Sequence, residues 1–184
     1  MPKGNKRIYL TFDDGPHPDI TPSVLVLLKE FDAKATFFCV GQNVEKFPET
    51  YQMILSAGHI TGNHSFNHMK GWKNSVSDYY ENIKKASLFI QSDYFRPPYG
   101  RITPAQIRKL KKEYRIVMWS VLSYDFDREI SAEQCFKNVI YHAQDGDIVV
   151  FHDSEKASHN MLSTLPKVLE YFKERGFSFA SLED

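Results

Sequence analysis

The chain has 184 residues, of which 23 are Lys or Arg and 23 are Asp or Glu, so its formal net charge is zero. At roughly 100–200 residues per domain, this length predicts one domain over residues 1–184 that folds without needing disulfides or structural metals. The charge balance argues against nucleic acid as a partner, because nucleic-acid-binding proteins usually carry an excess of Lys and Arg. With 42% hydrophobic residues and no apolar run of the ~20 residues that a membrane helix needs, we expect a soluble protein without membrane insertion.

The cysteines and the N-terminal residues bear on the cellular compartment. Cys39 and Cys135 are the only two cysteines, which excludes a disulfide scaffold and a Cys-rich zinc module. Cys39 lies in an apolar run and is expected to be a small buried thiol. No apolar signal-peptide core precedes the first predicted strand, so the sequence predicts a cytoplasmic protein, with an exported protein whose signal was removed as the alternative.

Short apolar segments of β type alternate with segments of helical periodicity along the chain. The predicted strands are Arg7–Phe12, Ala35–Val40, His59–Gly62, Ile116–Leu122, Asp147–Phe151 and Phe177–Ser181, and one or two further short strands are expected near Phe95 and in the loops. The predicted helices are Val24–Phe31, Tyr51–Ala57, Ala105–Glu113, a segment from Ser131 to about His142, and Thr164–Arg175. Strands that alternate with helices imply a mainly parallel α/β sheet covered by helices, either an open sheet or an irregular barrel.

Residues typical of helix ends flank the predicted helices: Thr21-Pro22, Thr103-Pro104 and Ser131 with Gln134 at N-termini, and Gly58 and Gly176 after C-termini. Ser and Thr hydroxyls accept hydrogen bonds from the first turn of a helix, a Gln three residues later completes a capping box, and glycine adopts the left-handed conformation that ends a helix. In sheets and barrels of this kind ligands bind at the carboxyl ends of the strands, so a candidate site has to lie there.

Two polar clusters that follow predicted strands have the composition of a metal site. Asp13 and Asp14 end the first strand and point in different directions, so the two acids can do two different jobs. His64 and His68 follow the third strand four residues apart, a spacing that places both imidazoles on one face of a helical turn. Two histidines with one carboxylate leave coordination positions open, as in catalytic metal sites. Taken alone, an acidic turn and a chance histidine pair are the alternatives.

Two further clusters follow later strands. The segment 95–100, Phe-Arg-Pro-Pro-Tyr-Gly, has a rigid backbone and one Arg, which suits the positioning of a carboxylate or the aiming of a backbone N–H. His152 ends the apolar strand at 147–151. Taken alone, these two clusters are equally consistent with a Pro-rich loop and a histidine of the core.

Together the four clusters, in this order at successive strand ends, resemble the motif set of the polysaccharide deacetylases, the NodB-homology domain of carbohydrate esterase family 4. The resemblance extends from Lys6 to the end of the chain and rests on Thr-Phe-Asp-Asp-Gly-Pro, His-Ser-x-x-His and Arg-Pro-Pro-Tyr-Gly. It implies an α/β fold, a distorted (β/α) barrel of about seven strands in a single domain.

The resemblance also implies a metal centre. Asp13 matches the general base that takes a proton from the metal-bound water, whereas Asp14, His64 and His68 match the metal ligands. A divalent ion there supplies Lewis acidity and a water that is acidic enough to react near neutral pH. Zinc is the expected metal because imidazole and carboxylate suit it, and cobalt or nickel would be accepted by the same ligands.

The remaining roles come from the same comparison of motifs. Arg96 matches the residue that orients the base, and the backbone N–H of Tyr99, in the loop that contains Pro97, matches the donor that stabilises the oxyanion. His152 matches the general acid that protonates the leaving amine, a role that an adjacent carboxylate favours. Asp125 matches that supporting carboxylate.

One motif departs from the family pattern, Asp-x-x-Asp-Trp. Aligned on it, this chain keeps Asp125 but has Leu122 in place of the first Asp and Phe126 in place of the Trp, and Val150 stands where Leu is usual in the fifth motif. Phe keeps an apolar face for stacking but lacks the indole N–H. We therefore expect complete catalytic machinery and an altered substrate groove, with Pro97, Leu122 and Phe126 among the substrate-binding residues.

The expected function is a metal-dependent hydrolase that removes N-acetyl groups from N-acetylglucosamine in chitin-type oligosaccharides or peptidoglycan, with an acetylated glycan as its partner. The alternatives are an O-acetyl esterase acting on xylan-type glycans, a non-catalytic carbohydrate- or metal-binding relative, and a non-haem iron oxygenase, which also uses two His and one carboxylate. A net charge of zero is consistent with a neutral glycan that needs no electrostatic steering.

Overall fold

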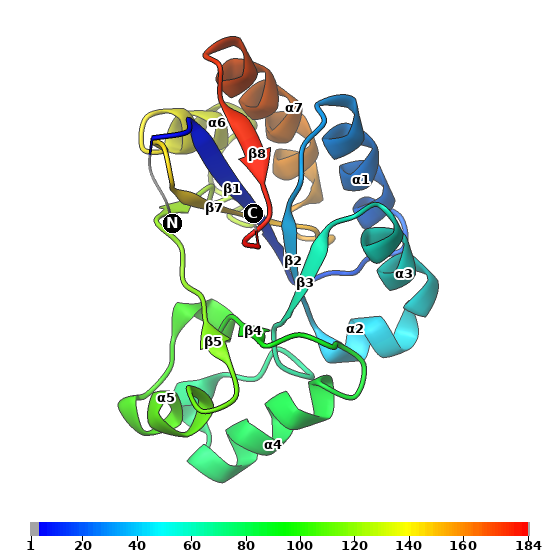
Figure 1. The fold of residues 1–184 in the computed structure, drawn as a ribbon, viewed down its shortest axis with the longest axis vertical. Helices are drawn as coiled ribbons and strands as arrows, with labels where there is room; N and C mark the ends of the chain where they lie inside the picture. Colours follow the sequence, from blue (N-terminus) through cyan, green and yellow to red (C-terminus); the bar gives the residue numbers. More distant parts are fainter. Residues whose placement is uncertain (1–3, 184) are drawn as a thin grey trace.

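The computed structural model describes residues 4–183, in which eight strands form one sheet (Figure 1). The strands are β1 (Arg7–Asp13), β2 (Thr36–Cys39), β3 (Ile60–Asn63), β4 (Tyr94–Phe95), β5 (Arg115–Ile116), β6 (Val121–Leu122), β7 (Ile148–His152) and β8 (Ser178–Ala180). Their order is β5-β4-β3-β2-β1-β7-β6, with β8 paired to β1 outside this path, and the pairings are parallel. The parallel α/β sheet predicted from the sequence is confirmed.

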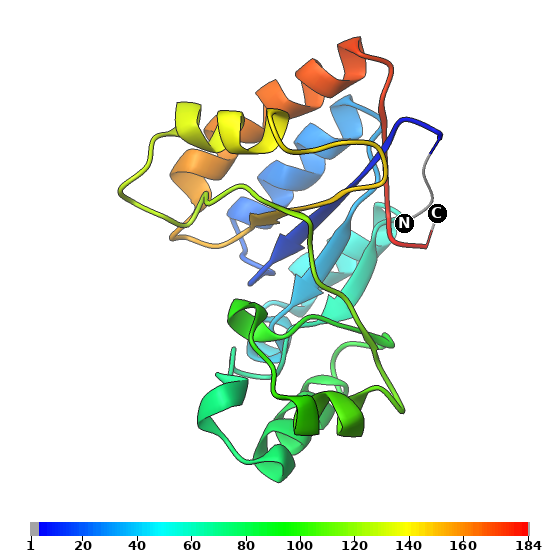
Figure 2. The ribbon, with the colours of Figure 1, turned by 90° about the vertical axis from the view of Figure 1, so that its left-hand side faces the viewer.

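Helices cover the outer side of the sheet (Figures 1 and 2). They are α1 (Ile20–Glu30), α2 (Gly41–Lys46), α3 (Pro48–Ser56), α4 (Val76–Ala86), α5 (Pro104–Leu110), α6 (Ala132–Ile140) and α7 (Ser158–Glu174), with short 3₁₀ turns at Gly71–Lys73 and Pro98–Gly100. Buried aromatic rings of the central strands fill the core beneath them, where Phe12 stacks between Phe37 and Phe151. In the described part of the chain, no helix has the length and apolar character needed to cross a membrane.

The sheet curls because its two outermost strands are close in the sequence. Only residues 117–120 separate β5 from β6, although these strands lie at opposite ends of the sheet order. Seven flat strands would place the outer two about 29 Å apart, whereas the connecting chain can span at most about 18 Å. The sheet therefore bends into an incomplete barrel, as the distorted (β/α) barrel prediction required.

The same segment corrects a predicted strand. Ile116–Leu122 was expected to be one strand, but its ends pair with different partners, β5 with β4 and β6 with β7. The backbone N–H groups of Val117 and Ser120 still donate to Phe95 of β4 and Ile148 of β7, but the chain between them leaves the sheet, and the carbonyl oxygens of Val117 and Met118 accept hydrogen bonds from Arg96. The apolar β-type pattern of residues 116–122 does not indicate where this break lies.

Two Thr-Pro sequences that look alike behave differently at helix starts. Thr103 caps α5 in a complete capping box with Gln106, as predicted. The predicted cap at Thr21 is wrong, because α1 begins at Ile20 and the Thr21 hydroxyl donates to the buried carboxylate of Asp153 at 2.5 Å. A tertiary partner therefore takes the hydroxyl that would otherwise cap the helix.

Other helix predictions are partly confirmed. Ser131 caps α6 by accepting from the Gln134 backbone N–H, but the Gln134 side chain donates to Asn138 instead of completing the box. Gly58 and Gly176 have positive φ angles of 74° and 78° after α3 and α7, as expected of glycines that end helices. Helices α2 and α4 were not predicted, and α7 begins earlier than expected, with Pro166 inside it.

Candidate active site

Asp13, the last residue of β1, is held by a buried arginine. The Arg96 side chain is 0% exposed, and its Nη1 donates to Asp13 Oδ1 and to Thr11 Oγ1, both at 2.7 Å. The carbonyl oxygens of Val117 and Met118 accept from the remaining nitrogens of the guanidinium at 3.3 and 3.2 Å. Burial favours a higher pKa for Asp13, but Arg96, through its charge and its hydrogen bond, and the nearby His64 and His152 together outweigh it and hold the pKa below the usual 3.8. Asp13 is therefore ionised at neutral pH and can accept a proton.

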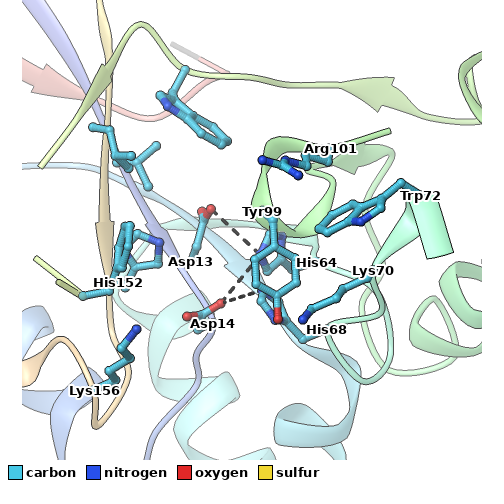
Figure 3. A pocket seen from close by; sticks show the side chains of 14 residues that line it. Asp13, Asp14, His64, His68, Lys70, Trp72, Tyr99, Arg101, His152 and Lys156 are labelled. Carbon is cyan, nitrogen blue, oxygen red and sulfur yellow. Dashed lines mark ion pairs between the residues drawn. The ribbon is translucent and has the colours of Figure 1, made fainter. Parts of the chain in front are cut away.

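Asp14, His64 and His68 each direct one ligand atom to a common point, and these atoms lie within 4.8 Å of one another (Figure 3). Asp14 Oδ1 is 3.2 Å from His68 Nε2 and 3.7 Å from His64 Nε2. This oxygen is buried and has no hydrogen-bond partner among the described residues. A buried anionic oxygen without a hydrogen bond, facing two imidazole nitrogens, fits a divalent cation.

The two imidazoles are prepared to act as ligands. His64 Nδ1 lies 2.8 Å from the carbonyl oxygen of Arg96, and because a carbonyl only accepts, Nδ1 carries the proton and Nε2 presents its lone pair. Burial, reinforced by the neighbouring His64, lowers the pKa of His68 to about 4. His68 is therefore neutral at neutral pH, as metal coordination requires.

The backbone around the histidine pair differs from the sequence prediction. His64 and His68 were expected on one helical turn, but residues 64–70 form an irregular loop after β3. Ser65 and His68 have positive φ angles of 65° and 56°, and the Asn63 side chain accepts from the Ser65 N–H at 2.8 Å. This local hydrogen bond and a long-range one, from the Gly41 N–H to the Ser65 carbonyl oxygen at 3.0 Å, replace the helical ones, and the two Nε2 atoms still converge on Asp14.

His152, the last residue of β7, lies beside Asp13 in the register of β1 and β7. Its Nδ1 is 2.7 Å from Asp125 Oδ1, and its backbone N–H donates to Asp125 Oδ2 at 2.7 Å. Burial acts to lower the pKa of His152, but the charge and hydrogen bond of Asp125, together with the charges of Asp14 and Asp13, outweigh it and raise the pKa to about 9. His152 is therefore protonated at neutral pH and can donate a proton.

The segment 97–100 forms the wall next to the histidine loop. Tyr99 has a positive φ of 61°, is 51% exposed, and places its ring 4.5 Å from that of His68. Gly100 packs against Trp119 so closely that a Cβ would lie 2.4 Å from the indole. Pro97, predicted to contact substrate, is buried behind the cleft, where its carbonyl oxygen accepts from the Gly100 N–H at 3.0 Å. Its contribution here is to the shape of the loop.

A cleft of about 570 Å³ surrounds these groups (Figure 3). Leu122, Phe126 and Val150, the three positions at which the sequence departs from the family motifs, all line it. The cleft is also lined by Lys70, Trp72, Arg101, Trp119 and Lys156. None of these five was among the predicted site residues, although Arg101 directly follows the Arg-Pro-Pro-Tyr-Gly motif.

Asp153 is a further residue that the sequence analysis left without a role. Its buried carboxylate accepts from the Gly15 N–H at 3.1 Å and from the Thr21 hydroxyl, and burial raises its pKa to about 7. A Cβ on Gly15 would lie 2.1 Å from Asp153 Oδ2, so only glycine fits this turn. Asp153 thereby fixes the turn that follows Asp14. Its position directly after His152 at a buried strand end was the available signal.

Comparisons with known proteins agree with this geometry. Residues 1–119 match the family described as polysaccharide deacetylase. A peptidoglycan-N-acetylglucosamine deacetylase of Bacillus cereus is 33% identical over 191 residues, which cover 100% of this chain and 90% of the relative. A chitooligosaccharide deacetylase of Azorhizobium caulinodans is 30% identical over 199 residues, which cover 98% of this chain and 94% of the relative.

The fold comparison leads to the same family. The crystal structure of a peptidoglycan N-acetylglucosamine deacetylase superposes with a TM-score of 0.93 at 31% identity, covering 98% of this chain and 88% of that one. Sequence and fold are thus similar over nearly the whole length of both proteins. The chain therefore belongs to the polysaccharide deacetylase family.

Proposed function

We propose that the protein is a metal-dependent hydrolase that removes N-acetyl groups from N-acetylglucosamine residues of a glycan. The observation that carries this proposal is one cleft in which an ionised Asp13, the Asp14/His64/His68 cluster and a protonated His152 face each other (Figure 3). Relatives named as deacetylases of peptidoglycan N-acetylglucosamine and of chitooligosaccharides support the same reaction.

Asp14, His64 and His68 would hold the divalent cation, and we propose zinc because a carboxylate with neutral imidazoles suits it, although cobalt and nickel accept the same donors. When bound, such a cation polarises the acetyl carbonyl and lowers the pKa of water.

Asp13 and His152 would carry out the two proton transfers of the reaction. Arg96 holds Asp13 Oδ1, while Asp13 Oδ2 lies 4.0 Å from His64 Nε2 and faces the cluster, where it accepts a proton from the attacking water. The backbone N–H of Tyr99 donates to the oxyanion that forms on the carbonyl. His152 gives its proton to the nitrogen as the C–N bond breaks, so that acetate and the free amine are released.

The experiment that tests this proposal measures acetate release from N-acetylated chitooligosaccharides, peptidoglycan fragments and O-acetylated xylan, with and without added zinc. We expect zinc-dependent release from the N-acetylated glycans. Release from xylan alone would instead identify an O-acetyl esterase. A protein that binds metal but releases no acetate from any of them would be a non-catalytic relative.

Two variants distinguish the role of Asp13 as the base from the role of His64 as a metal ligand. Asp13→Asn keeps the metal but lowers kcat by roughly 10²–10⁴-fold, because the amide cannot accept the proton. His64→Ala loses both metal and activity, because a ligand is removed. Metal content by mass spectrometry and acetate release check both variants. Stoichiometric metal in the His64→Ala protein would disprove the ligand assignment.

A further inference from the structure

Three cationic side chains line the cleft without a carboxylate partner: Lys70, Arg101 and Lys156. In the part of the chain that the structure describes, their side chains take part in no ion pair or hydrogen bond, and their contacts are with aromatic rings. The lining has two carboxylates, Asp13 and Asp14, and both belong to the catalytic cluster. The three positive charges are therefore available to a ligand.

Each of these cations lies over a ring of the cleft wall: Lys70 Nζ is 5.1 Å from the centroid of Tyr99, the Arg101 guanidinium 5.0 Å from that of Trp72, and Lys156 Nζ 5.3 Å from that of Phe126. The ring attracts the cation and holds it near the wall. Aromatic faces are also surfaces on which apolar faces of sugars pack. A sugar that stacks there would have its substituents close to a positive charge.

The cations lie on both sides of the reaction centre (Figure 3). Lys70 and Arg101 lie on the side of Tyr99, whereas Lys156 lies on the side of His152. The catalytic carboxylates lie between these two groups. A glycan that presents one sugar to the catalytic groups therefore brings its neighbouring sugars toward a positive charge on either side.

We propose that Lys70, Arg101 and Lys156 select glycans in which the sugars on both sides of the reacting N-acetylglucosamine carry carboxylates, in preference to neutral polymers of N-acetylglucosamine. This inference rests on the proposed function of the same site. An alternating glycan of N-acetylglucosamine and N-acetylmuramic acid with free lactyl carboxylates, which is the peptidoglycan backbone without its peptides, presents this charge pattern. Complementary charges favour such a ligand over a neutral one and speed its association.

The test removes the three charges together, in a variant with Lys70→Gln, Arg101→Gln and Lys156→Gln. Two substrates of equal length are compared, an alternating tetrasaccharide of N-acetylglucosamine and N-acetylmuramic acid with free carboxylates and the same glycan with its carboxylates amidated. We expect kcat/KM for acetate release from the acidic glycan to fall roughly tenfold through KM, since each exposed ion pair contributes up to about fivefold. The value for the amidated glycan falls less, because this glycan has no carboxylates for the removed cations to attract.

A matched control removes three exposed charges elsewhere, through Arg108→Gln, Lys112→Gln and Lys167→Gln, none of which lines the cleft. We expect this control to behave as the unmodified protein does. Raising the salt concentration should lower kcat/KM of the unmodified protein for the acidic glycan only, because salt screens exposed charges.

The outcomes distinguish the two proposals. Equal kcat/KM of the unmodified protein for the acidic and amidated glycans, or an equal loss on both in the cleft variant, overturns the charge selection and leaves the deacetylase function intact. Acetate release from neither glycan contradicts the deacetylase function. In that case, calorimetry measures the affinity of the protein for each of the two glycans and tests the charge selection. Equal affinities overturn it.

Discussion

Asp13 and His152 lie side by side at the ends of β1 and β7, yet the protein holds them in opposite protonation states, Asp13 deprotonated and His152 protonated. Arg96 keeps the Asp13 carboxylate ionised, and Asp125 keeps the His152 imidazole protonated. An acid and a base with pKa values displaced in opposite directions are typical of acid-base catalysis. At the scale of single residues, the chemistry thus depends on which charged partner each group has.

The pH dependence of the reaction tests this arrangement. In Asp125→Asn the pKa of His152 falls, because the charge that raises it to about 9 is removed. A general acid must be protonated, so the alkaline limb of the kcat profile moves to lower pH, and at pH 8 the rate falls roughly ten- to thirtyfold. Kinetics from pH 5 to 10 measure this shift. Asp127→Asn is the matched control, and an alkaline limb that stays in place in Asp125→Asn argues against His152 as the acid.

At the scale of elements, His59 connects the starts of two central strands. It lies just before β3, and its Nδ1 accepts from the Ala35 N–H, just before β2, at 3.2 Å. Its ring is 5.5 Å from that of Phe37. Burial, together with the charge of Lys34, lowers the pKa of His59 to about 4. The neutral imidazole is therefore part of the folded structure.

This pKa makes stability depend on pH. Below pH 6.5 the unfolded chain takes up a proton at His59 that the folded protein does not take up until about pH 4, so the free energy of unfolding decreases as the pH falls through this window. Between pH 7 and pH 5, we expect the free energy of unfolding of the unmodified protein to fall by about 1 kcal/mol more than that of His59→Asn. This value allows for partial solvent screening. Urea unfolding at both pH values measures it. His142→Asn, at an exposed position, should lose as much as the unmodified protein. Parallel losses in all three proteins would show that His59 does not contribute.

At the scale of the whole molecule, the cleft exists because the sheet curls. Residues 117–120 bring the ends of the sheet together and present two carbonyl oxygens to Arg96, which in turn holds Asp13. The three proposed ligands come from the end of β1 and from the loop after β3. A cation bound there would connect segments that are distant in the sequence.

Metal binding should accordingly stabilise the folded protein. A ligand that binds only the folded state adds about 2.7 kcal/mol at a hundredfold excess over its Kd, which for a chain of this size raises Tm by roughly 5–10 °C. We expect zinc to produce this increase in a thermal unfolding experiment. His68→Ala should lose it, whereas His159→Ala, away from the cleft, should keep it. An undiminished increase in His68→Ala would contradict the proposed site.

Much of the candidate site was predictable because it lies at strand ends, which local apolar patterns reveal. Asp13 and His152 follow such patterns, Arg96 lies in a rigid Pro-rich segment, and the resemblance to a known motif set added Asp125. One failure shows how a distant partner can override a local pattern. Thr21 has the same Thr-Pro pattern as a true cap, but the carboxylate of Asp153 takes its hydroxyl.

The sequence by itself determined the alternation of strands and helices and the family to which the chain is similar, because periodicity, caps and short motifs are properties of neighbouring residues. The tertiary structure alone decided the break between β5 and β6, the irregular loop that carries His64 and His68, and the positive charges around the cleft. The net charge of zero does not indicate that Lys70, Arg101 and Lys156 lie together around the cleft. Each of these features depends on segments far apart in the chain meeting in space, which no local pattern records.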